Sequence, residues 1–172
     1  MRIQVPRQPH PVCLFCGLLA PDAAWLARGA AALSDVYGAI AARSAAFPFT
    51  FTDYYAAEMG APLWRQFVTL VTPVDPGQLP EIKHRTIAIE TDLADGGRRR
   101  VNLDPGYLTP AKLVLASTKD FHHRIYLRAG IHAELTLAFD QHGCVFYPWT
   151  YADYRSPAAT TFLLAERARL KL

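Results

Sequence analysis

The sequence predicts a single α+β domain over residues 1–172, with helices packed on one face of an antiparallel sheet. Three observations lead to this prediction. First, a chain of 172 residues, 51% hydrophobic and 19% charged, is long and apolar enough for one hydrophobic core. Second, its apolar patterns follow the order strand, helix, strand, strand, helix, strand, which is typical of the split βαβ, ferredoxin-like arrangement. Third, the last third of the chain adds a β-hairpin and a C-terminal helix.

The N-terminal pattern predicts the first strand and the first helix. Residues 12–19 are almost all apolar, which indicates a buried strand. Pro21 and Asp22 then mark the start of a helix, with Asp22 as its N-cap. Helical spacing places five apolar residues on the face that should cover the sheet: Leu26, Leu33, Val36, Tyr37 and Ile40.

Two further strands and a second helix follow. Alternating Phe and Thr predict a strand over residues 47–54, and a third strand is expected near residues 64–72. Prolines and a glycine then break the chain before a helix over residues 80–93. The face of this helix that packs on the sheet should hold Ile82, Thr86, Ile89 and Leu93.

The next segment is expected to turn sharply. A strand over residues 99–103 should end in a tight turn at Pro105 and Gly106, since Pro fixes one dihedral and Gly permits a positive φ. Thr109 and Pro110 should then cap and open a short apolar helix through residue 115. At the end of the chain, Ser156 and Pro157 predict the start of the C-terminal helix.

Composition limits the cellular setting. The net charge of +3 permits an anionic partner but does not require nucleic acid. Residues 12–20 loosely resemble a signal peptide, but the run is only nine residues long and contains two cysteines. The odd number of cysteines favours a reducing compartment, and no apolar run approaches the ~20 residues of a membrane span. We therefore expect a cytoplasmic protein without a membrane segment.

Cys13 and Cys16 have the spacing of a metal or redox pair. The second pair that a zinc site needs is missing, and positions three apart on a strand point to opposite faces. We therefore expect two buried structural cysteines and no metal site at this place.

A hairpin over residues 122–139 has a register that follows from its alternating pattern. A three-residue turn over residues 128–130 pairs Leu127 with Ile131 and keeps the apolar residues on one face. The other face then becomes a ladder of polar pairs: Arg124 with Glu134, Tyr126 with His132, and His122 with Thr136.

The polar ladder has two interpretations. An exposed sheet face is normally polar, and its cross-strand pairs contribute only ~0.2–1 kcal/mol each. Alternatively, the ladder floors a ligand-binding cleft that neighbouring loops help to form, in which Arg and Lys neutralise an anion and carboxylates or His move a proton. On this second interpretation the catalytic candidates are Asp104, Glu134 and His132, and the ligand-binding candidates are Lys112, Lys119, Arg124 and Tyr126.

Two aromatic segments one hundred residues apart, 47–54 and 147–154, have matching Pro, Thr, Asp and Tyr residues. A repeated segment indicates a repeated structural role. Asp53 and Asp153 either accept hydrogen bonds within an aromatic core, or face one cavity as acid/base groups or ligands of a hard cation such as Mg²⁺. We include both as ligand-binding candidates, and the use of Mg²⁺ as a cofactor stays open.

Several longer stretches resemble one known family. They are residues 102–108, 112–120, 123–127 and 133–137, together with the aromatic segments 47–60 and 148–156. They are similar to the bacterial and archaeal family called domain of unknown function 4416, and the likeness covers almost the whole chain. The resemblance implies no settled activity, substrate or catalytic residues. Some members carry a GTP-binding label, which this sequence does not support because it lacks the Gly-rich Lys-Ser/Thr phosphate loop.

The functional prediction is therefore a ligand class. The protein is expected to bind a small phosphorylated or otherwise anionic ligand, with a nucleotide as one candidate and hydrolase or transferase chemistry as an option. The alternative is a non-catalytic module that binds RNA or protein with its sheet face, because aromatics beside Arg favour stacking on single-stranded bases. The dependence of binding on salt concentration distinguishes the two interpretations, since RNA binding weakens steeply as the salt concentration rises.

Overall fold

The computed structural model describes residues 5–170, and within this range the protein is an α+β fold with nine strands and four α-helices. The strands are β1 (Cys13–Ala20), β2 (Ile40–Arg43), β3 (Phe47–Pro48), β4 (Trp64–Leu70), β5 (Asn102–Leu108), β6 (Lys112–Ser117), β7 (Arg124–Arg128), β8 (Ile131–Phe139) and β9 (Cys144–Phe146). The helices are α1 (Ala23–Tyr37), α2 (Ala56–Met59), α3 (Leu79–Asp92) and α4 (Pro157–Arg169), with short 3₁₀ helices η1 (Pro76–Gln78) and η2 (Ala152–Arg155).

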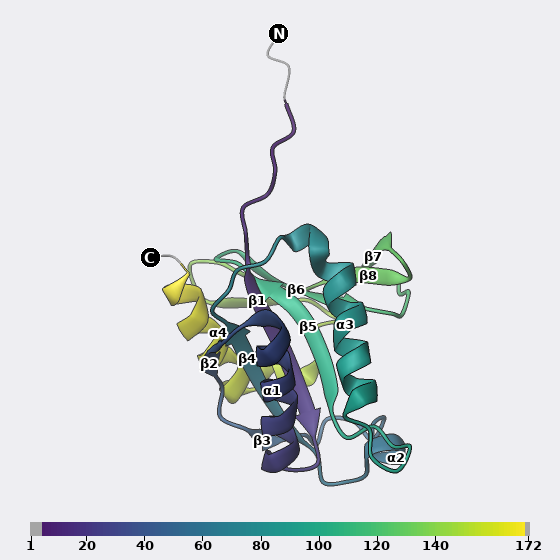
Figure 1. The fold of residues 1–172 in the computed structure, drawn as a ribbon. Helices are drawn as coiled ribbons and strands as arrows, with labels where there is room; N and C mark the ends of the chain where they lie inside the picture. Colours follow the sequence, from purple (N-terminus) through teal and green to yellow (C-terminus); the bar gives the residue numbers. More distant parts are fainter. Residues whose placement is uncertain (1–4, 171–172) are drawn as a thin grey trace.

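The strands form one sheet in the order β2-β4-β1-β5-β6-β8-β7, and each pairing is antiparallel. β3 pairs with β4, and β9 pairs with β8. β1 lies between β4 and β5 and is buried along its whole length, which confirms the strand predicted over residues 12–19 (Figure 1).

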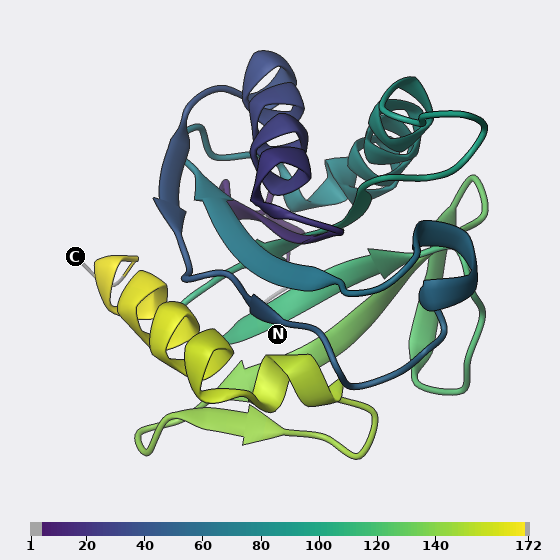
Figure 2. The ribbon, with the colours of Figure 1, turned by 90° about the horizontal axis from the view of Figure 1, so that it is seen from below.

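Helices cover both faces of the sheet, with α1 and α3 on one face and α4 on the other (Figure 2). Side chains of β1 alternate between the two cores. Leu14, Cys16 and Leu18 pack with α1 and α3, whereas Cys13 and Phe15 pack with α4. The two cysteines thus point to opposite faces and are buried and free, as the sequence predicts.

The predicted helix starts are confirmed. The Asp22 carboxylate accepts a hydrogen bond from the Trp25 amide at 2.9 Å, and the Ser156 hydroxyl accepts one from Ala159 at 3.2 Å. Side-chain oxygens at these positions satisfy amides that the first helical turn leaves free. The predicted face of α1 is wrong at its end, because Val36 is exposed and Ile40 belongs to β2.

The strand predicted over residues 47–54 is mostly wrong, because only Phe47 and Pro48 pair with β4. Beyond them the chain turns locally, and the Thr52 hydroxyl accepts a hydrogen bond from the Tyr54 amide at 3.1 Å. Thr side chains offer the backbone this alternative to a sheet ladder. The aromatic rings that resemble a strand face instead pack on one another, with Phe49 edge-on to Tyr55 at 6.0 Å.

The tight turn predicted at Pro105 and Gly106 is also wrong, because both residues lie inside β5. Gly106 is required there by close packing: a β-carbon would fall well inside contact distance of the Val114 carbonyl oxygen on β6. The short helix predicted after Thr109 is replaced by a turn and β6, since the Thr109 hydroxyl accepts the Lys112 amide at 3.1 Å. Short apolar runs fit a buried strand as well as a helix.

The hairpin of β7 and β8 has the predicted pairs Arg124–Glu134 and Tyr126–His132. Its turn differs from the prediction. Ala129 and Gly130 form a two-residue turn with φ of 52° and 75°, and a bulge between Tyr126 and Arg128 restores the register. His122 does not pair with Thr136, because the chain turns at Phe121 and the strand begins only at Arg124.

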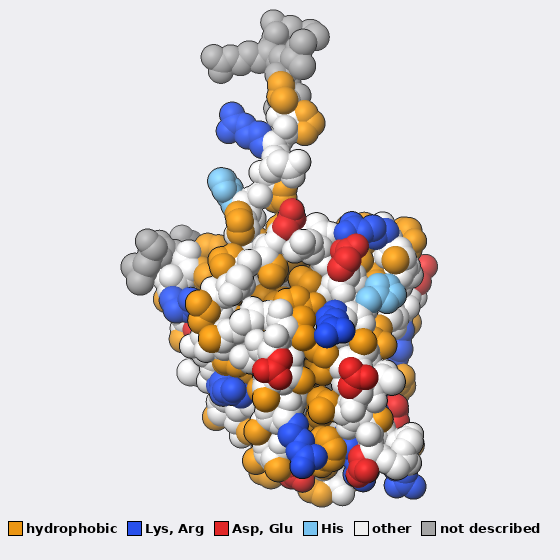
Figure 3. All heavy atoms as spheres, in the orientation of Figure 1, with side chains coloured by type: hydrophobic (Ala, Val, Ile, Leu, Met, Phe, Trp, Pro, Cys, Tyr) orange, Lys and Arg blue, Asp and Glu red, His pale blue; other side chains and the backbone are white. Residues whose placement is uncertain are grey.

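Over residues 5–170, none of the helices is long and apolar enough to cross a membrane. On the face over α1 and α3, charged side chains of both signs are scattered among hydrophobic ones (Figure 3). That face therefore does not present a stripe of a single charge.

Candidate functional site

A cavity of about 630 Å³ opens where β5 and β6 separate. These strands pair only over Gly106–Leu108 and Leu113–Leu115, although β5 starts at Asn102 and β6 continues to Ser117. We call this cavity the split-sheet pocket. It is bounded by Asn102 and Asp104 of β5, Ala116 and Ser117 of β6, and Lys83 of α3.

Pro105 explains why the two strands separate. In an antiparallel ladder, every second residue exchanges main-chain hydrogen bonds with the same neighbouring strand. Thr109 and Lys112 are one such hydrogen-bonded pair, since the Thr109 amide donates to the Lys112 carbonyl at 2.9 Å. Moving two residues along each strand, the next hydrogen-bonded pair is Tyr107 with Val114. The pair after that would be Pro105 with Ala116. Proline has no N–H to donate, and the ladder stops before it.

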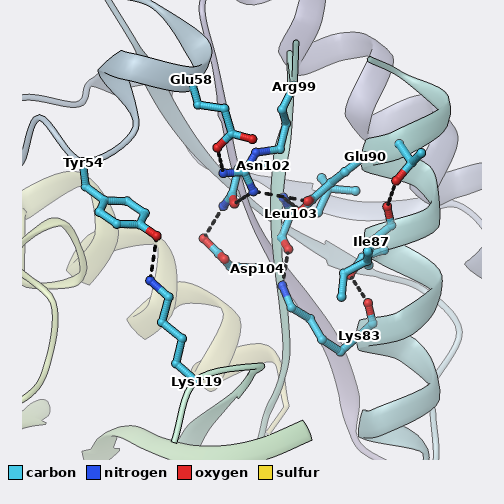
Figure 4. A network of polar contacts seen from close by, with 12 residues as sticks. Tyr54, Glu58, Lys83, Ile87, Glu90, Arg99, Asn102, Leu103, Asp104 and Lys119 are labelled. Atoms are coloured by element: carbon cyan, nitrogen blue, oxygen red, sulfur yellow. Dashed lines mark hydrogen bonds and ion pairs between the residues drawn. The ribbon is translucent and has the colours of Figure 1, made fainter. Parts of the chain in front are cut away.

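Two side chains of α3 take the place of the missing strand beside Leu103 (Figure 4). The Leu103 amide donates to Glu90 Oε1 at 2.6 Å, and Lys83 Nζ donates to the Leu103 carbonyl at 3.0 Å. Both main-chain groups of a buried residue are thereby satisfied. The sheet can open at this point without leaving a bare strand edge.

Arg65 of β4 lies at the floor of the pocket and is buried between two carboxylates. Its Nε donates to Asp153 Oδ2 at 2.8 Å, and its Nη1 donates to Asp104 Oδ2 at 3.0 Å. The rings of Phe49 and Phe67 lie 5.2 and 5.9 Å from the guanidinium carbon. Such a buried cation needs this charge pairing, because desolvation without a partner is costly.

The two carboxylates bonded to Arg65 differ in their pKa. Burial by itself would raise the pKa of Asp104, but Arg65 and Lys83 together lower it below the ordinary value. Burial raises the pKa of Asp153 in spite of Arg65. Asp104 Oδ2 also accepts from Asn102 Nδ2 at 2.8 Å, whereas Oδ1 has no hydrogen-bond partner within residues 5–170. Asp104 thus has an oxygen left for a ligand.

Lys119 lies at another side of the pocket, in the loop after β6. Its Nζ donates to the Tyr54 hydroxyl at 2.9 Å and lies 4.2 Å from the centre of that ring. The hydrogen bond from Lys119 lowers the pKa of Tyr54. Figure 4 shows Lys119 and Lys83 on either side of Asp104.

Arg124 is largely engaged within the protein. Its Nε donates to Glu134 at 2.7 Å, its Nη1 to the Ser117 hydroxyl and the Lys119 carbonyl, and its Nη2 to the Tyr151 hydroxyl. Four of its five N–H groups are therefore occupied. This arrangement fixes the loop that carries Lys119 to the hairpin and to η2.

Glu134 is fully buried beside Arg124. Its Oε2 also contacts His123 Nε2 at 3.0 Å, and its Oε1 accepts from the Thr136 hydroxyl at 3.2 Å. The His123 ring is stacked against Trp149 at 5.1 Å. The Arg124–Glu134 pair of the predicted ladder thus belongs to a packed internal network, whereas Tyr126 of the next pair is exposed.

The structure brings five of the nine predicted site residues to the split-sheet pocket. They are Asp104, Lys119, Arg124, Glu134 and Asp153. Both copies of the repeated aromatic segment line it too, the first through Phe49, Phe51, Thr52 and Tyr54 and the second through residues 151–154. The roles predicted for these residues stay predictions, and their convergence from distant parts of the chain defines the candidate site.

The other four predicted residues lie outside the pocket lining. Lys112 is exposed at the far end of β6, where it pairs with Ala138. His132 turns its Nε2 toward Asp120 at 3.6 Å. Tyr126 is 60% exposed on β7, and Asp53 is exposed in the loop before α2.

Several pocket residues were not anticipated from the sequence. Arg65 could have been found, because it is a charge between Trp64 and Phe67 in a strand that is otherwise mostly apolar. Lys83 and Glu90 are seven residues apart on α3 and adjoin its buried face, which was a second signal. The lining also contains residues outside the nine predicted ones, namely Arg99, Asn102, Tyr54, Tyr55, Ser117, Tyr151 and Tyr154.

A metal centre is not evident in the described range. Over residues 5–170, the structure has no group of three or more His, Cys, Asp or Glu side chains arranged to hold a metal ion. Asp153 lines the pocket and Asp53 does not.

The fold and the pocket define an α+β protein with an open, charged cavity inside a split antiparallel sheet. The chain belongs to the family described as Domain of unknown function (DUF4416), whose model matches residues 10–170. The family resemblance seen in the sequence is therefore confirmed. Comparison of the chain with curated proteins and with solved structures finds no match in either.

Proposed function

We propose that the protein binds a small phosphorylated ligand in the split-sheet pocket. The observation that carries this proposal is that two lysines of the pocket have no carboxylate partner within the described range. Lys83 and Lys119 both line the pocket, and neither has a carboxylate within 4.0 Å among residues 5–170. Lys83 is buried, and its ammonium makes one hydrogen bond, to the Leu103 carbonyl. A buried ammonium has three N–H groups, so an anionic ligand would supply the missing acceptors.

The other cations of the pocket are already paired. Arg65 is bonded to Asp104 and Asp153, Arg99 to Glu90, and Arg124 to Glu134. The two lysines are therefore the cationic groups that remain for a ligand. A volume of about 630 Å³ also lies within the range of small-molecule sites.

Ring stacking supports a nucleotide as one member of this ligand class. Phe49, Tyr54, Tyr55, Phe121 and Tyr151 line the pocket beside the charged groups. Aromatic side chains bind planar rings by stacking. If the bound ester is also hydrolysed or transferred, Asp104 is the group placed to accept a proton, because both oxygens of Glu134 are already hydrogen-bonded.

We also propose that the segment from β1 to β5 is a ferredoxin-like core. Its elements follow the order β1, α1, β2, β4, α3, β5, and the strands lie side by side as β2-β4-β1-β5. The placement of α1 and α3 on one face supports this proposal. The remaining strands would then be an extension of the sheet, and the pocket would lie at the junction.

Thermal unfolding against a panel of ligands tests the binding proposal. The panel holds inorganic phosphate, sugar phosphates, nucleotides and short RNAs, each with and without Mg²⁺. A phosphorylated ligand at one hundred times its Kd should stabilise the protein by about 2.7 kcal/mol. Lys83→Met should abolish the shift, whereas Arg85→Met, at an exposed position on the same helix, should preserve it.

Two results would contradict the binding proposal. One is a panel in which only RNA shifts the unfolding temperature, with an effect that disappears as salt rises, which would favour the RNA-binding alternative. The other is a phosphate response that is the same in Lys83→Met as in the wild type, because the ligand would then bind elsewhere.

A further inference from the structure

Tyr154 of η2 places a hydroxyl group in the pocket region without a hydrogen-bond partner. The side chain is 1% exposed and lines the split-sheet pocket, and its oxygen makes no hydrogen bond within residues 5–170. Most buried side-chain hydroxyls in folded proteins have at least one partner. A group that binds in the pocket would provide one.

Gly17 of β1 allows this hydroxyl to lie close to the backbone of the sheet. A β-carbon at this position would lie 3.0 Å from the Tyr154 oxygen and 3.3 Å from Arg65 Nη1. Gly17 is also directly opposite Asp104 in the pairing of β1 with β5. The Tyr154 hydroxyl, Arg65 and Asp104 therefore border the same place over the middle of the sheet.

The charge around Tyr154, Arg65 and Asp104 differs from the charge around Lys83 and Lys119. Arg65 is bonded to two carboxylates, so the local charge is not positive. The lowered pKa of Asp104 keeps it ionised at neutral pH, and its Oδ1 is available as an acceptor. A phosphate would be repelled by this carboxylate, whereas a neutral hydroxyl group can donate to Asp104 and accept from Tyr154.

We propose that the ligand is a phosphate ester of a hydroxylated compound, of the class of sugar phosphates and nucleotides, and that Asp104 and Tyr154 bind one of its hydroxyl groups. This inference rests on the proposed function, since Lys83 and Lys119 hold the phosphate. Tyr154 is then a specificity-determining residue, which distinguishes hydroxylated esters from simple phosphates.

Calorimetric titration with matched ligands tests this inference. The probes are inorganic phosphate, methyl phosphate, ribose 5-phosphate, glucose 6-phosphate and adenosine monophosphate. At least one hydroxylated ester should bind about tenfold more tightly than methyl phosphate. Tyr154→Phe keeps the buried ring and should weaken only the hydroxylated esters, by about three- to tenfold. Tyr107→Phe is the control, because Tyr107 lies on the same strand as Asp104 but packs away from the pocket.

The outcomes separate the two proposals. If methyl phosphate binds as tightly as every hydroxylated ester, or if Tyr154→Phe weakens all phosphates equally, the hydroxyl inference is overturned while phosphate binding stands. If none of the five probes binds, the proposed function fails and the inference fails with it. A loss confined to hydroxylated esters in Tyr154→Phe supports both.

Discussion

Glu90 accepts the main-chain amide hydrogen of Leu103 at 2.6 Å, at a point where a neighbouring strand would ordinarily supply a carbonyl oxygen. Lys83, two helical turns away on the same face of α3, donates to the Leu103 carbonyl. One helix thus satisfies the main-chain amide and carbonyl of Leu103. This residue has no partner on β6, because the pairing of β5 with β6 stops before Pro105. The pocket exists because these side chains replace the hydrogen bonds that β6 would have made.

Removal of the Glu90 carboxylate tests this replacement. Glu90→Ala should lower the free energy of unfolding by about 1–3 kcal/mol, because the buried Leu103 amide loses its acceptor. Glu90→Gln retains an acceptor oxygen and should lose less. Urea denaturation measures both variants. Equal stability of Glu90→Ala and the wild type would show that the amide does not depend on this side chain.

Arg65 is expected to be the most sensitive charged position in the floor of the pocket. Arg65→Met leaves Asp153 buried without a cation and should cost about 3–5 kcal/mol of unfolding free energy. Arg43→Met, at an exposed position on the adjacent strand β2, should change stability by less than about 0.5 kcal/mol.

A second substitution separates charge from packing at Arg65. Adding Asp153→Asn to Arg65→Met removes one unpaired charge and should regain part of the lost stability in chemical denaturation. If the double variant is no more stable than Arg65→Met, the loss arises from packing against Phe49 and Phe67 instead.

Asp104 should contribute to stability in a pH-dependent way. Its pKa is lowered in the folded protein, so its ionised form stabilises the fold above the ordinary value of 3.8, and this contribution is lost as the pH falls through the lowered value. The stability difference between wild type and Asp104→Asn should therefore be largest near neutral pH and shrink below about pH 4. Unfolding curves from pH 3 to pH 7 measure it.

The comparison with Asp104→Asn cancels the part of the opposing contributions that is due to burial. Burial raises the pKa of Asp153 and of Glu90 in both proteins, whereas the further rise that the Asp104 charge causes is present in the wild type alone. A difference that grows as the pH falls would mean that the pKa of Asp104 is raised rather than lowered.

The hairpin turn offers a stabilising substitution. Ala129 has a φ of 52°, which costs free energy for any residue with a β-carbon and is best tolerated by Asn among such residues. Ala129→Asn should raise the free energy of unfolding by about 0.5–1 kcal/mol. Ala129→Val should lower it, because β-branched residues are strained at positive φ. Equal effects of the two substitutions would contradict the two-residue turn.

Elements with strong periodicity were predictable from the sequence. The sequence predicts five elements at nearly the observed places: β1, α1, β4, α3 and α4. Their hydrophobic patterns follow directly from the burial of one or both faces of each element. The pairing of Arg124 with Glu134 was also predictable, because alternation fixes a hairpin register locally. The bulge that allows this register with a shorter turn has no clear signal in the pattern.

The pocket was harder to predict because it depends on contacts between distant segments. Pro105 and Gly106 have the composition of a turn, but in the folded sheet Pro105 ends a ladder and Gly106 permits close approach of β6. Arg65 and Asp153 are 88 residues apart, so their pairing cannot be inferred from spacing alone. The sequence indicated Asp104 and Lys119 through their polar segment but not the residues that face them.

A crystal structure of the protein grown with saturating inorganic phosphate is the most direct test of the central claim. The account predicts an anion in the split-sheet pocket, hydrogen-bonded to Lys83 and Lys119 and away from the Asp104 carboxylate. A pocket that holds only water at saturating phosphate, or an anion bound only elsewhere on the surface, would contradict it.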